Sequence, residues 1–222
     1  MIAQLSGVNK RMKVTIFGAS GGIGKFAVKH ALSKGYTVNA YLRDPDKLAL
    51  RSDKLIIFKG EITDYSLMKS AIEGCDAVIW CVGVNMKKHS GGMPSLEGHY
   101  LLFNAMKECK ITRLIDWATT SVKFKDDKWS IITIFPGFFA GILLKQAKSE
   151  MVAIGKAVLE SGLDWTLVRF VAPRDTPYTG KVKTSFGDVH IRMAISREDI
   201  GAFMVEQVES NQYHCSTPII GS

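Results

Sequence analysis

Apolar positions along the chain follow two spacings, one typical of buried strands and one typical of helices. Residues 14–17 form a short run that is apolar apart from one threonine, as expected for a parallel strand covered on both faces. After the glycines that follow, apolar residues recur at helical spacing. This predicted helical face comprises Ile23, Phe26, Ala27, His30 and Ala31. The first part of the chain therefore reads as strand, turn and helix.

The same alternation continues to the end of the chain. Further strands are predicted at residues 37–42, 55–58, 77–81, 113–117 and 165–170, and further helices at residues 65–72, 96–109, 148–161 and 196–209. Ser196 is the predicted N-cap of the last helix, with Asp199 at the third position, as in a capping box. Regular alternation of this kind predicts an α/β protein: a single-domain Rossmann fold with a doubly wound, mainly parallel sheet and helices on both faces.

Length and composition agree with one domain. The 222 residues are 46% hydrophobic, enough for a full core, and no linker interrupts them. We expect a loosely ordered N-terminal extension at residues 1–11, without an apolar signal segment, and an NAD(P)-binding Rossmann domain at residues 12–222. The longest apolar stretch, residues 131–144, is too short to cross a bilayer. A cytoplasmic protein without a membrane partner is the expectation.

The charge balance bears on possible partners. Lys and Arg outnumber Asp and Glu by 29 to 21, so the formal net charge is +8. The basic residues are scattered and form no nucleic-acid-binding motif, which favours a positive cleft for a polyanionic cofactor and a planar acidic substrate. The four cysteines form no CxxC pair, so we expect core thiols in a reducing compartment and no metal site. We expect a monomer or a weak homodimer.

The glycines after the first strand have the spacing of a dinucleotide-binding turn. Gly18 permits a tight turn, Gly21 lets the backbone approach phosphate oxygens, and Gly24 lets the helix pack closely on the strand. Backbone N–H groups at the helix start then face an anion. The predicted pyrophosphate-binding turn comprises Gly18, Ala19, Ser20, Gly21, Gly22, Ile23 and Gly24.

The end of the second strand bears on which dinucleotide is bound. An NAD site usually places a carboxylate here for the ribose hydroxyls, but residues 38–42 contain none. Arg43 instead offers a guanidinium that fits a 2′-phosphate, which favours NADP. The alternative is that Arg43 is only a solvated surface charge. Asp44 and Pro45 read as a helix N-cap and first helical residue.

Residues that follow the other strands are expected at the same ligand-binding edge of the sheet. Glu61 is predicted to accept a bond from the adenine amino group, with Ile62 against the ring, although a solvated carboxylate is an equal alternative. Gly83 would let the backbone approach the nicotinamide ribose, and a plain turn is its alternative. The predicted cofactor-binding residues after the fourth and fifth strands are Cys81, Val82, Gly83, Thr119 and Thr120. Hydroxyls there, including Ser121, are also ordinary in loops.

Several of these segments together resemble a known family. The segments are residues 17–24, 42–44, 60–64, 75–79, 161–169 and 195–201. They look like the atypical short-chain dehydrogenase/reductases of the NmrA-like type, and most like the group containing biliverdin reductase B and bacterial NAD(P)H-flavin reductases. The resemblance runs from Met12 to the C-terminus. It implies NADPH-dependent reduction of flavins such as FMN or similar planar acceptors, with Thr119 as the catalytic position beside the nicotinamide.

Two features depart from that resemblance. Met151 stands where biliverdin reductase B has a substrate-side histidine, which puts tetrapyrrole reduction in doubt. The segment 124–144 is longer and more apolar than expected, and the sequence assigns it no role.

The catalytic Tyr-x-x-x-Lys pair of typical short-chain dehydrogenases is missing after the fifth strand. That region has Lys145 and Lys148 but no tyrosine, and the only such spacing, Tyr65 and Lys69, lies on the helix after the third strand. A carbonyl reductase is therefore disfavoured, because an alkoxide needs a proton donor. A flavin can take its proton from water, so juxtaposition of two rings suffices.

Other functions stay open at this point. The main alternative is a non-catalytic, NADP-binding sensor protein of the NmrA-like type. An epimerase or dehydratase acting on a nucleotide sugar fits less well, since the Tyr-Lys pair is missing and the C-terminal region is short.

Overall fold

A computed structural model of the chain describes residues 12–84, 92–128 and 145–222. The predicted extension at residues 1–11 and most of the long apolar segment, residues 129–144, lie outside the described residues. Strands of the main sheet are β1 (Lys13–Phe17), β2 (Thr37–Leu42), β3 (Leu55–Lys59), β4 (Ala77–Trp80), β5 (Arg113–Ala118), β6 (Asp164–Arg169), β8 (Lys183–Ser185) and β10 (Ile219–Gly221).

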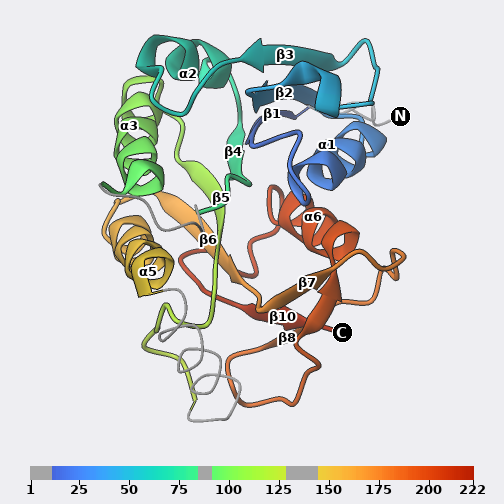
Figure 1. Cartoon of the computed structure of the whole chain (residues 1–222), viewed down its shortest axis with the longest axis vertical. Coiled ribbons are helices and arrows are strands. Elements are labelled where there is room, and N and C mark those ends of the chain that lie inside the picture. Colours follow the sequence, from blue (N-terminus) through green and yellow to red (C-terminus); the bar gives the residue numbers. More distant parts are fainter. Residues whose placement is uncertain (1–11, 85–91, 129–144) are drawn as a thin grey trace, which may run out of the picture.

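These strands form a sheet in the order β3-β2-β1-β4-β5-β6-β10-β8 (Figure 1). Pairs from β3 to β10 are parallel, and only β8 runs antiparallel, against β10. The strand order reverses between β1 and β4, as in the doubly wound Rossmann arrangement. Two further strands, β7 (Ala172–Arg174) and β9 (Ala194–Ser196), form a small parallel sheet of their own.

Helices cover both faces of the main sheet (Figure 1). On one side lie α1 (Gly24–Ser33) and α6 (Arg197–Glu206). On the other lie α2 (Tyr65–Ile72), α3 (Pro94–Glu108) and α5 (Lys145–Leu159). A short 3-10 turn, η1 (Pro45–Lys47), follows β2 and has Asp44 as its N-cap, as predicted. The predicted fold class, a doubly wound and mainly parallel sheet with helices on both faces, is confirmed.

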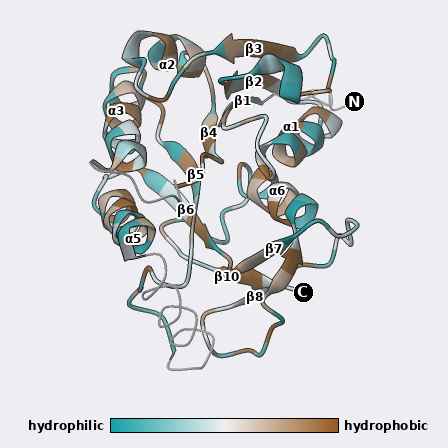
Figure 2. Cartoon of the chain, viewed as in Figure 1, coloured by the Kyte–Doolittle hydropathy of each residue, from teal (hydrophilic) through white to brown (hydrophobic). Residues whose placement is uncertain are grey.

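The core is divided by the sheet into two apolar layers. Figure 2 shows apolar residues along β3, β4 and β10, and both polar and apolar residues on the helices. On the face covered by α2 and α3, the ring of Phe17 lies 4.7 Å from that of Tyr41 and 5.1 Å from that of Trp80. The polar Thr15 in buried β1 costs little, because its hydroxyl donates to the Ala71 carbonyl at 2.6 Å.

Some predicted boundaries and contacts are wrong in detail. The buried face of α1 centres on Ala27, Val28 and Ala31, so Phe26 and His30 lie at its margin. The last helix ends at Glu206 and not at residue 209. Ser196 is its N-cap, as predicted, but Asp199 accepts hydrogen bonds from another loop and does not complete a capping box. Strands β7 to β10 were not predicted, because three-residue strands leave almost no periodic signal.

The cysteines are only partly as expected. All four are free, which agrees with the absence of a disulfide framework. Cys75 is buried, Cys81 and Cys109 are half-buried, and Cys215 is exposed, so the expectation of core thiols is wrong for Cys215. Over the described ranges, His, Cys, Asp and Glu residues form no cluster suited to a metal ion. None of the helices found there has the length and apolarity needed to traverse a bilayer.

A buried arginine ties the loop after β5 to the sheet. The fully buried side chain of Arg169 donates to both carboxylate oxygens of Asp127, at 2.8 and 2.5 Å. Two further N–H groups donate to the carbonyls of Thr217, at 2.8 Å, and Val122, at 3.0 Å. A guanidinium that is paired and hydrogen-bonded can be buried at acceptable cost, whereas an unpaired one cannot. Loss of Asp127 would therefore be costly.

We expect Asp127→Ala to lower the free energy of unfolding by about 3–5 kcal/mol, because it leaves a buried guanidinium without its carboxylate. Urea denaturation measures the loss. Asp126→Ala, at the exposed neighbouring position, is the matched control and should change stability by less than about 0.5 kcal/mol. Equal stabilities for the two variants would contradict this account of the ion pair.

Candidate functional site

The glycine turn between β1 and α1 is built on contacts that exclude side chains. Gly18 has a φ of +71°, and a Cβ there would lie 2.9 Å from the backbone of Cys81. The N–H groups of Gly18 and Ala19 both donate to the Tyr41 carbonyl, at 2.9 and 3.2 Å. A Cβ on Gly24 would collide with the carbonyl oxygen of Gly18. Glycine is therefore needed at both ends of the turn for close packing.

The start of α1 offers unpaired hydrogen-bond donors. Over the described residues, the backbone N–H groups of Gly22, Ile23 and Gly24 have no hydrogen-bond partner, whereas that of Gly21 donates to the Gly18 carbonyl at 2.9 Å. Free N–H groups at the positive end of a helix dipole form an anion-binding site. The turn therefore fits the pyrophosphate of a dinucleotide.

A cavity of about 540 Å³ opens beside this turn, at the carboxyl ends of the parallel strands. Its wall comprises Gly21, Gly22, Ile23, Cys81, Gly83, Val84, Trp117, Thr119, Ser121, Ala147, Lys148, Met151, Phe170, Val171, Pro173 and Arg197. These residues come from the glycine turn, from strands β5 and β7, from the loops after β4, β5 and β6, and from helices α5 and α6. The cavity thus joins an anion-binding turn to a mostly apolar chamber, as a dinucleotide and an adjacent acceptor require.

One side of the chamber is aromatic. The rings of Trp117 and Phe170 are stacked, with centroids 5.3 Å apart and planes 19° apart. The Trp117 indole N–H donates to the Val82 carbonyl at 3.0 Å, and its backbone N–H donates to Asp116 Oδ1 at 2.7 Å. These bonds hold the indole in one orientation, so the chamber has a preformed wall suited to a planar molecule.

A buried polar pair supports this wall from behind. Asp116 Oδ2 lies 3.0 Å from His99 Nε2, and His99 Nδ1 donates to the Ser95 carbonyl at 2.6 Å. Directly after the neighbouring strand β4, burial raises the pKa of the Cys81 thiol, and the nearby Asp116 carboxylate adds to that shift. Cys81 is therefore a neutral thiol at physiological pH and not a nucleophile.

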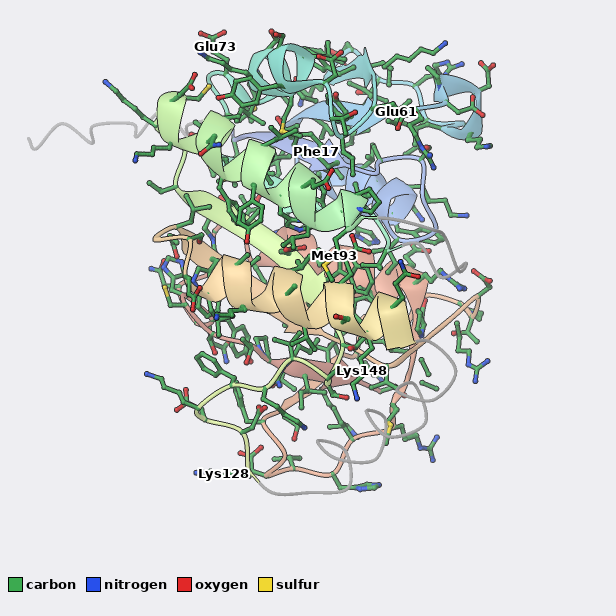
Figure 3. The ribbon with its side chains drawn as sticks, turned by 60° about the vertical axis from the view of Figure 1, so that its left-hand side comes forward. Phe17, Glu61, Glu73, Met93, Lys128 and Lys148 are labelled. Carbon is green, nitrogen blue, oxygen red and sulfur yellow. The ribbon has the colours of Figure 1, made fainter. Side chains whose placement is uncertain are left out.

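Helix α5 is held against the start of α3 next to the cavity. The buried carboxylate of Glu150 accepts from the N–H groups of Ser95, at 2.7 Å, and Leu96, at 3.2 Å. Figure 3 shows Met93, directly before α3, and Lys148 on α5. The capping contact places Lys148 and Met151 on the cavity wall. Met151 is thus part of the cavity wall, and its place on the substrate side stays a prediction.

Six of the predicted site residues line the cavity: Gly21, Gly22, Ile23, Cys81, Gly83 and Thr119. Four others, Gly18, Ala19, Ser20 and Gly24, form the rest of the turn. Val82 contributes its carbonyl to Trp117 and does not line the wall. Thr120 is buried away from the wall, and its hydroxyl has no partner among the described residues.

Three predicted residues lie beyond the cavity wall, where β2 and β3 end. Arg43 is exposed directly after β2. The backbone carbonyl of Glu61 accepts from the Tyr41 hydroxyl at 2.8 Å, and burial, reinforced by Asp64 and Glu61, raises the pKa of Tyr41 to about 12. A Cβ on Gly98 of α3 would lie 3.0 Å from the Ile62 side chain. Their proposed contacts with the adenosine stay predictions.

The sequence reasoning missed part of the wall. Phe170 and Val171 directly follow β6, so the strand-end rule applied to the other strands would have found them. Pro173 and Arg197 have no such signal, since the chain brings them to the cavity only through the small β7–β9 sheet and the start of α6.

Tyr65 and Lys69 serve another purpose than catalysis. Both contact the same carboxylate, Glu108 on α3: the Tyr65 hydroxyl at 2.8 Å and the Lys69 ammonium at 2.7 Å. The three side chains are part of the exposed seam between α2 and α3, and none of them lines the cavity. Tyr65 and Lys69 therefore take part in a contact between helices α2 and α3.

Comparison with known proteins assigns the chain to a family. The sequence profile of the NAD(P)H-binding family matches residues 18–211, most of the chain. The chain belongs to the NAD(P)H-binding family. Cinnamoyl-CoA reductase 1 from Arabidopsis thaliana is 30% identical over 122 residues, which cover 51% of this chain and 36% of that protein. Anthocyanidin reductase from the same plant is 29% identical over 111 residues, 44% of this chain and 32% of that protein. The chain thus spans about a third of the length of these curated relatives.

Solved structures share the fold over almost the whole chain. A putative epimerase from Bacteroides thetaiotaomicron has a TM-score of 0.78 at 20% identity, covering 96% of this chain and 97% of its own. The anaerobillin reductase ChuY from Escherichia coli O157:H7 has a TM-score of 0.76 at 19% identity, and the match covers 95% of this chain and 97% of that protein. A short-chain dehydrogenase/reductase from Veillonella parvula DSM 2008 in complex with NADP has a TM-score of 0.76 at 15% identity, and the match covers 95% of this chain and 94% of that protein. At these identities the three structures show that the fold is shared.

The position of Arg43 leads to a test of cofactor preference. Arg43→Ala should weaken NADPH binding about ten- to hundredfold and leave NADH binding nearly unchanged, because a charged hydrogen bond to phosphate contributes about 1.5–3 kcal/mol. Titration of both cofactors by fluorescence measures the effect, with the exposed Arg192→Ala as control. Equal losses for both cofactors would show that Arg43 does not contact the 2′-phosphate.

Proposed function

We propose that this protein is an NADPH-dependent reductase that passes hydride to a flavin or a similar planar acceptor. The observation that carries the proposal is a single cavity in which an anion-binding glycine turn continues into an apolar, aromatic-walled chamber. The family and the reductases among its relatives support the general class. The planar acceptor rests on the shape and chemistry of the chamber.

Each part of the cavity has a role in holding the dinucleotide. The cofactor supplies the hydride when it is bound. Backbone N–H groups of Gly22, Ile23 and Gly24 would bind its pyrophosphate. Arg43 would bind the 2′-phosphate, and the Thr119 hydroxyl would orient the nicotinamide amide on the cavity wall. The rings of the cofactor and the acceptor would then lie in contact, which is the main requirement for transfer.

The acceptor side is mostly apolar. Trp117 and Phe170 form its aromatic side, and Met151 adds an adaptable apolar side chain from α5. Neutral hydroxyls at Thr119 and Ser121 are poor proton donors, so water supplies the proton in this proposal. Lys148 is the strongest acid candidate on the described wall and is therefore included in the test below.

The decisive experiment is steady-state oxidation of NADPH with FMN added. Turnover that saturates with FMN supports the proposal. A protein that binds NADPH but does not oxidise it with FMN or other planar acceptors is instead a dinucleotide sensor, and the reductase proposal then fails. Met151→His tests the acceptor side, since a polar ring in the apolar wall should change the order of preference among acceptors more than it changes NADPH affinity.

We expect Thr119→Ala to slow hydride transfer only about two- to tenfold, because a neutral hydrogen bond contributes roughly 0.5–1.5 kcal/mol. Single-turnover oxidation of bound NADPH by FMN, measured across pH, reports this step directly. Tyr65→Phe is the control and should leave the rate unchanged, since its hydroxyl binds Glu108 outside the cavity. A loss on the order of a thousandfold in Thr119→Ala or Lys148→Met would reveal a specific catalytic acid and refute transfer by juxtaposition.

A further inference from the structure

A positively charged side chain lies across the glycine turn. If Gly22 carried a Cβ, that atom would lie 3.1 Å from Cδ and 3.2 Å from Nε of Arg197. Arg197 also lines the cavity together with Gly21 and Ile23. Its side chain therefore lies beside Gly22, in the turn where the N–H groups of Gly22 and Ile23 have no hydrogen-bond partner over the described residues.

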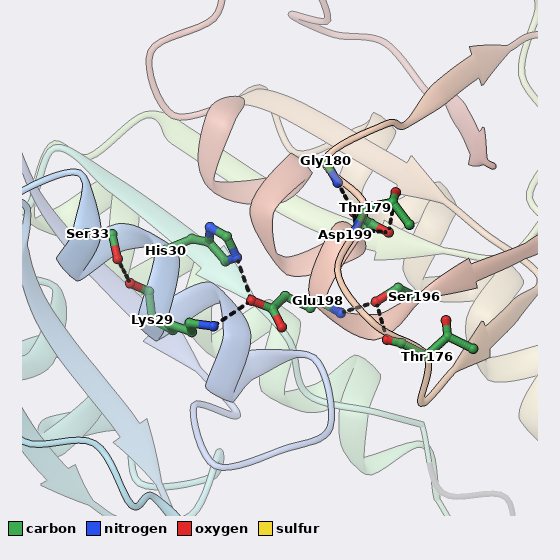
Figure 4. Close-up of polar contacts among 9 residues, drawn as sticks. All are labelled: Lys29, His30, Ser33, Thr176, Thr179, Gly180, Ser196, Glu198 and Asp199. Atoms are coloured by element: carbon green, nitrogen blue, oxygen red, sulfur yellow. Dashed lines mark hydrogen bonds and ion pairs between the residues drawn. The ribbon is translucent and has the colours of Figure 1, made fainter.

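The backbone of Arg197 is held firmly relative to that turn. Arg197 is the first residue of α6, and α6 packs so closely on α1 that a Cβ on Gly201 would lie 2.8 Å from the Ala27 nitrogen. Figure 4 shows a second link between the two helices, in which Glu198 binds the side chains of Lys29, at 2.7 Å, and His30, at 3.2 Å. Burial opposes ionisation of Glu198, but these hydrogen bonds keep its pKa below the usual value.

The loop before α6 is anchored as well. The Ser196 hydroxyl donates to the Thr176 carbonyl at 3.0 Å, and the carboxylate of Asp199 accepts from the N–H groups of Thr179, at 3.1 Å, and Gly180, at 2.9 Å (Figure 4). These contacts therefore link the turn, α1, α6 and this loop around the backbone of Arg197.

The guanidinium of Arg197 has a weak partner. Its Nη1 lies 2.7 Å from Oδ2 of Asp175, a side chain that is 81% exposed, while the Arg197 side chain itself is 29% exposed. An ion pair so open to water contributes little stability and is easily exchanged. The Asp175 carboxylate thus binds the Arg197 guanidinium and leaves the pair open to water.

We propose that Arg197 binds the cofactor pyrophosphate, and that Asp175 holds its guanidinium only while the dinucleotide is absent. This inference rests on dinucleotide binding at the glycine turn. A guanidinium presents a planar pair of donors that matches two phosphate oxygens, and the pyrophosphate carries more charge than one carboxylate. On binding, the guanidinium exchanges Asp175 for the pyrophosphate, which is then held by α1 amides on one side and by α6 on the other.

The competing explanation is that the Arg197–Asp175 pair only fastens the segment after β7. The two explanations differ in the sign of one effect. If the pair is a fastener, removing either partner has the same consequence. If Arg197 binds pyrophosphate, Asp175 competes with the ligand, so removal of Asp175 should strengthen binding while removal of Arg197 weakens it.

The test is isothermal titration calorimetry of the full chain with NADPH, NADH and ADP-ribose, which share the pyrophosphate. Arg197→Met should weaken all three ligands about ten- to hundredfold, whereas Arg43→Ala should weaken NADPH alone. Asp175→Asn should raise the affinity for all three ligands by up to several-fold, because the competing carboxylate is removed. Arg174→Met, an exposed arginine beside Asp175, is the matched control and should behave as wild type.

Each other outcome has a definite meaning. Equal weakening by Arg197→Met and Asp175→Asn, or unchanged affinity in a folded Arg197→Met variant, overturns the inference and leaves the proposed function intact. A wild-type protein that binds none of the three ligands overturns the proposed function itself. If Arg197→Met does not fold, Arg197→Lys keeps the charge without the paired donors. It should still lose affinity for all three ligands, while wild-type affinity in that variant would count against the inference.

Discussion

The close contact between Gly18 and the first residue of α1 is the constraint on which the site depends. A Cβ on Gly24 would strike the Gly18 carbonyl, and one on Gly18 would strike the backbone after β4. Only without these atoms can α1 begin directly above the switch in strand order between β1 and β4. That placement leaves three N–H groups without partners over the described residues, and it gives α6 the surface on which its own glycine packs. The anion site and the cavity wall beyond it follow from one steric requirement.

The remaining wall is held by buried polar contacts from behind. Arg169 and Asp127 fix the loop that carries Thr119 and Ser121, while Asp116 and His99 fix the backbone beside Trp117. Buried charges are costly unless they are paired, so these contacts allow few alternative arrangements. The apolar groups in front of them can therefore form a preformed surface. Rigid support behind an apolar wall is what a reaction based on the juxtaposition of two rings requires.

The side chains on the described wall bear on which acceptor the proposed reaction would use. Helix α5 brings Lys148 and Met151 to the cavity, but the described lining contains no tyrosine. The side chains of Tyr65 and Lys69 on α2 bind Glu108 on α3, away from the cavity. Cys81, the thiol on the wall, is kept neutral by burial. The cavity thus offers binding and orientation, and this balance favours an acceptor that needs no strong acid from the protein.

The sequence by itself determined the features that depend on neighbouring residues. The strand, glycine turn and helix at residues 14–31, the alternation that yields the doubly wound sheet, and the hydroxyls after β5 are all short-range patterns. Tertiary structure decided the rest, because the decisive contacts join distant segments. Arg169 meets Asp127 across 42 positions, Trp117 stacks on Phe170, and Arg197 reaches Gly22 from the far end of the chain. Three-residue strands such as β8 and β10 exist only through such pairing. These contacts leave no local pattern in the sequence, because they form only when the whole sheet packs with its helices.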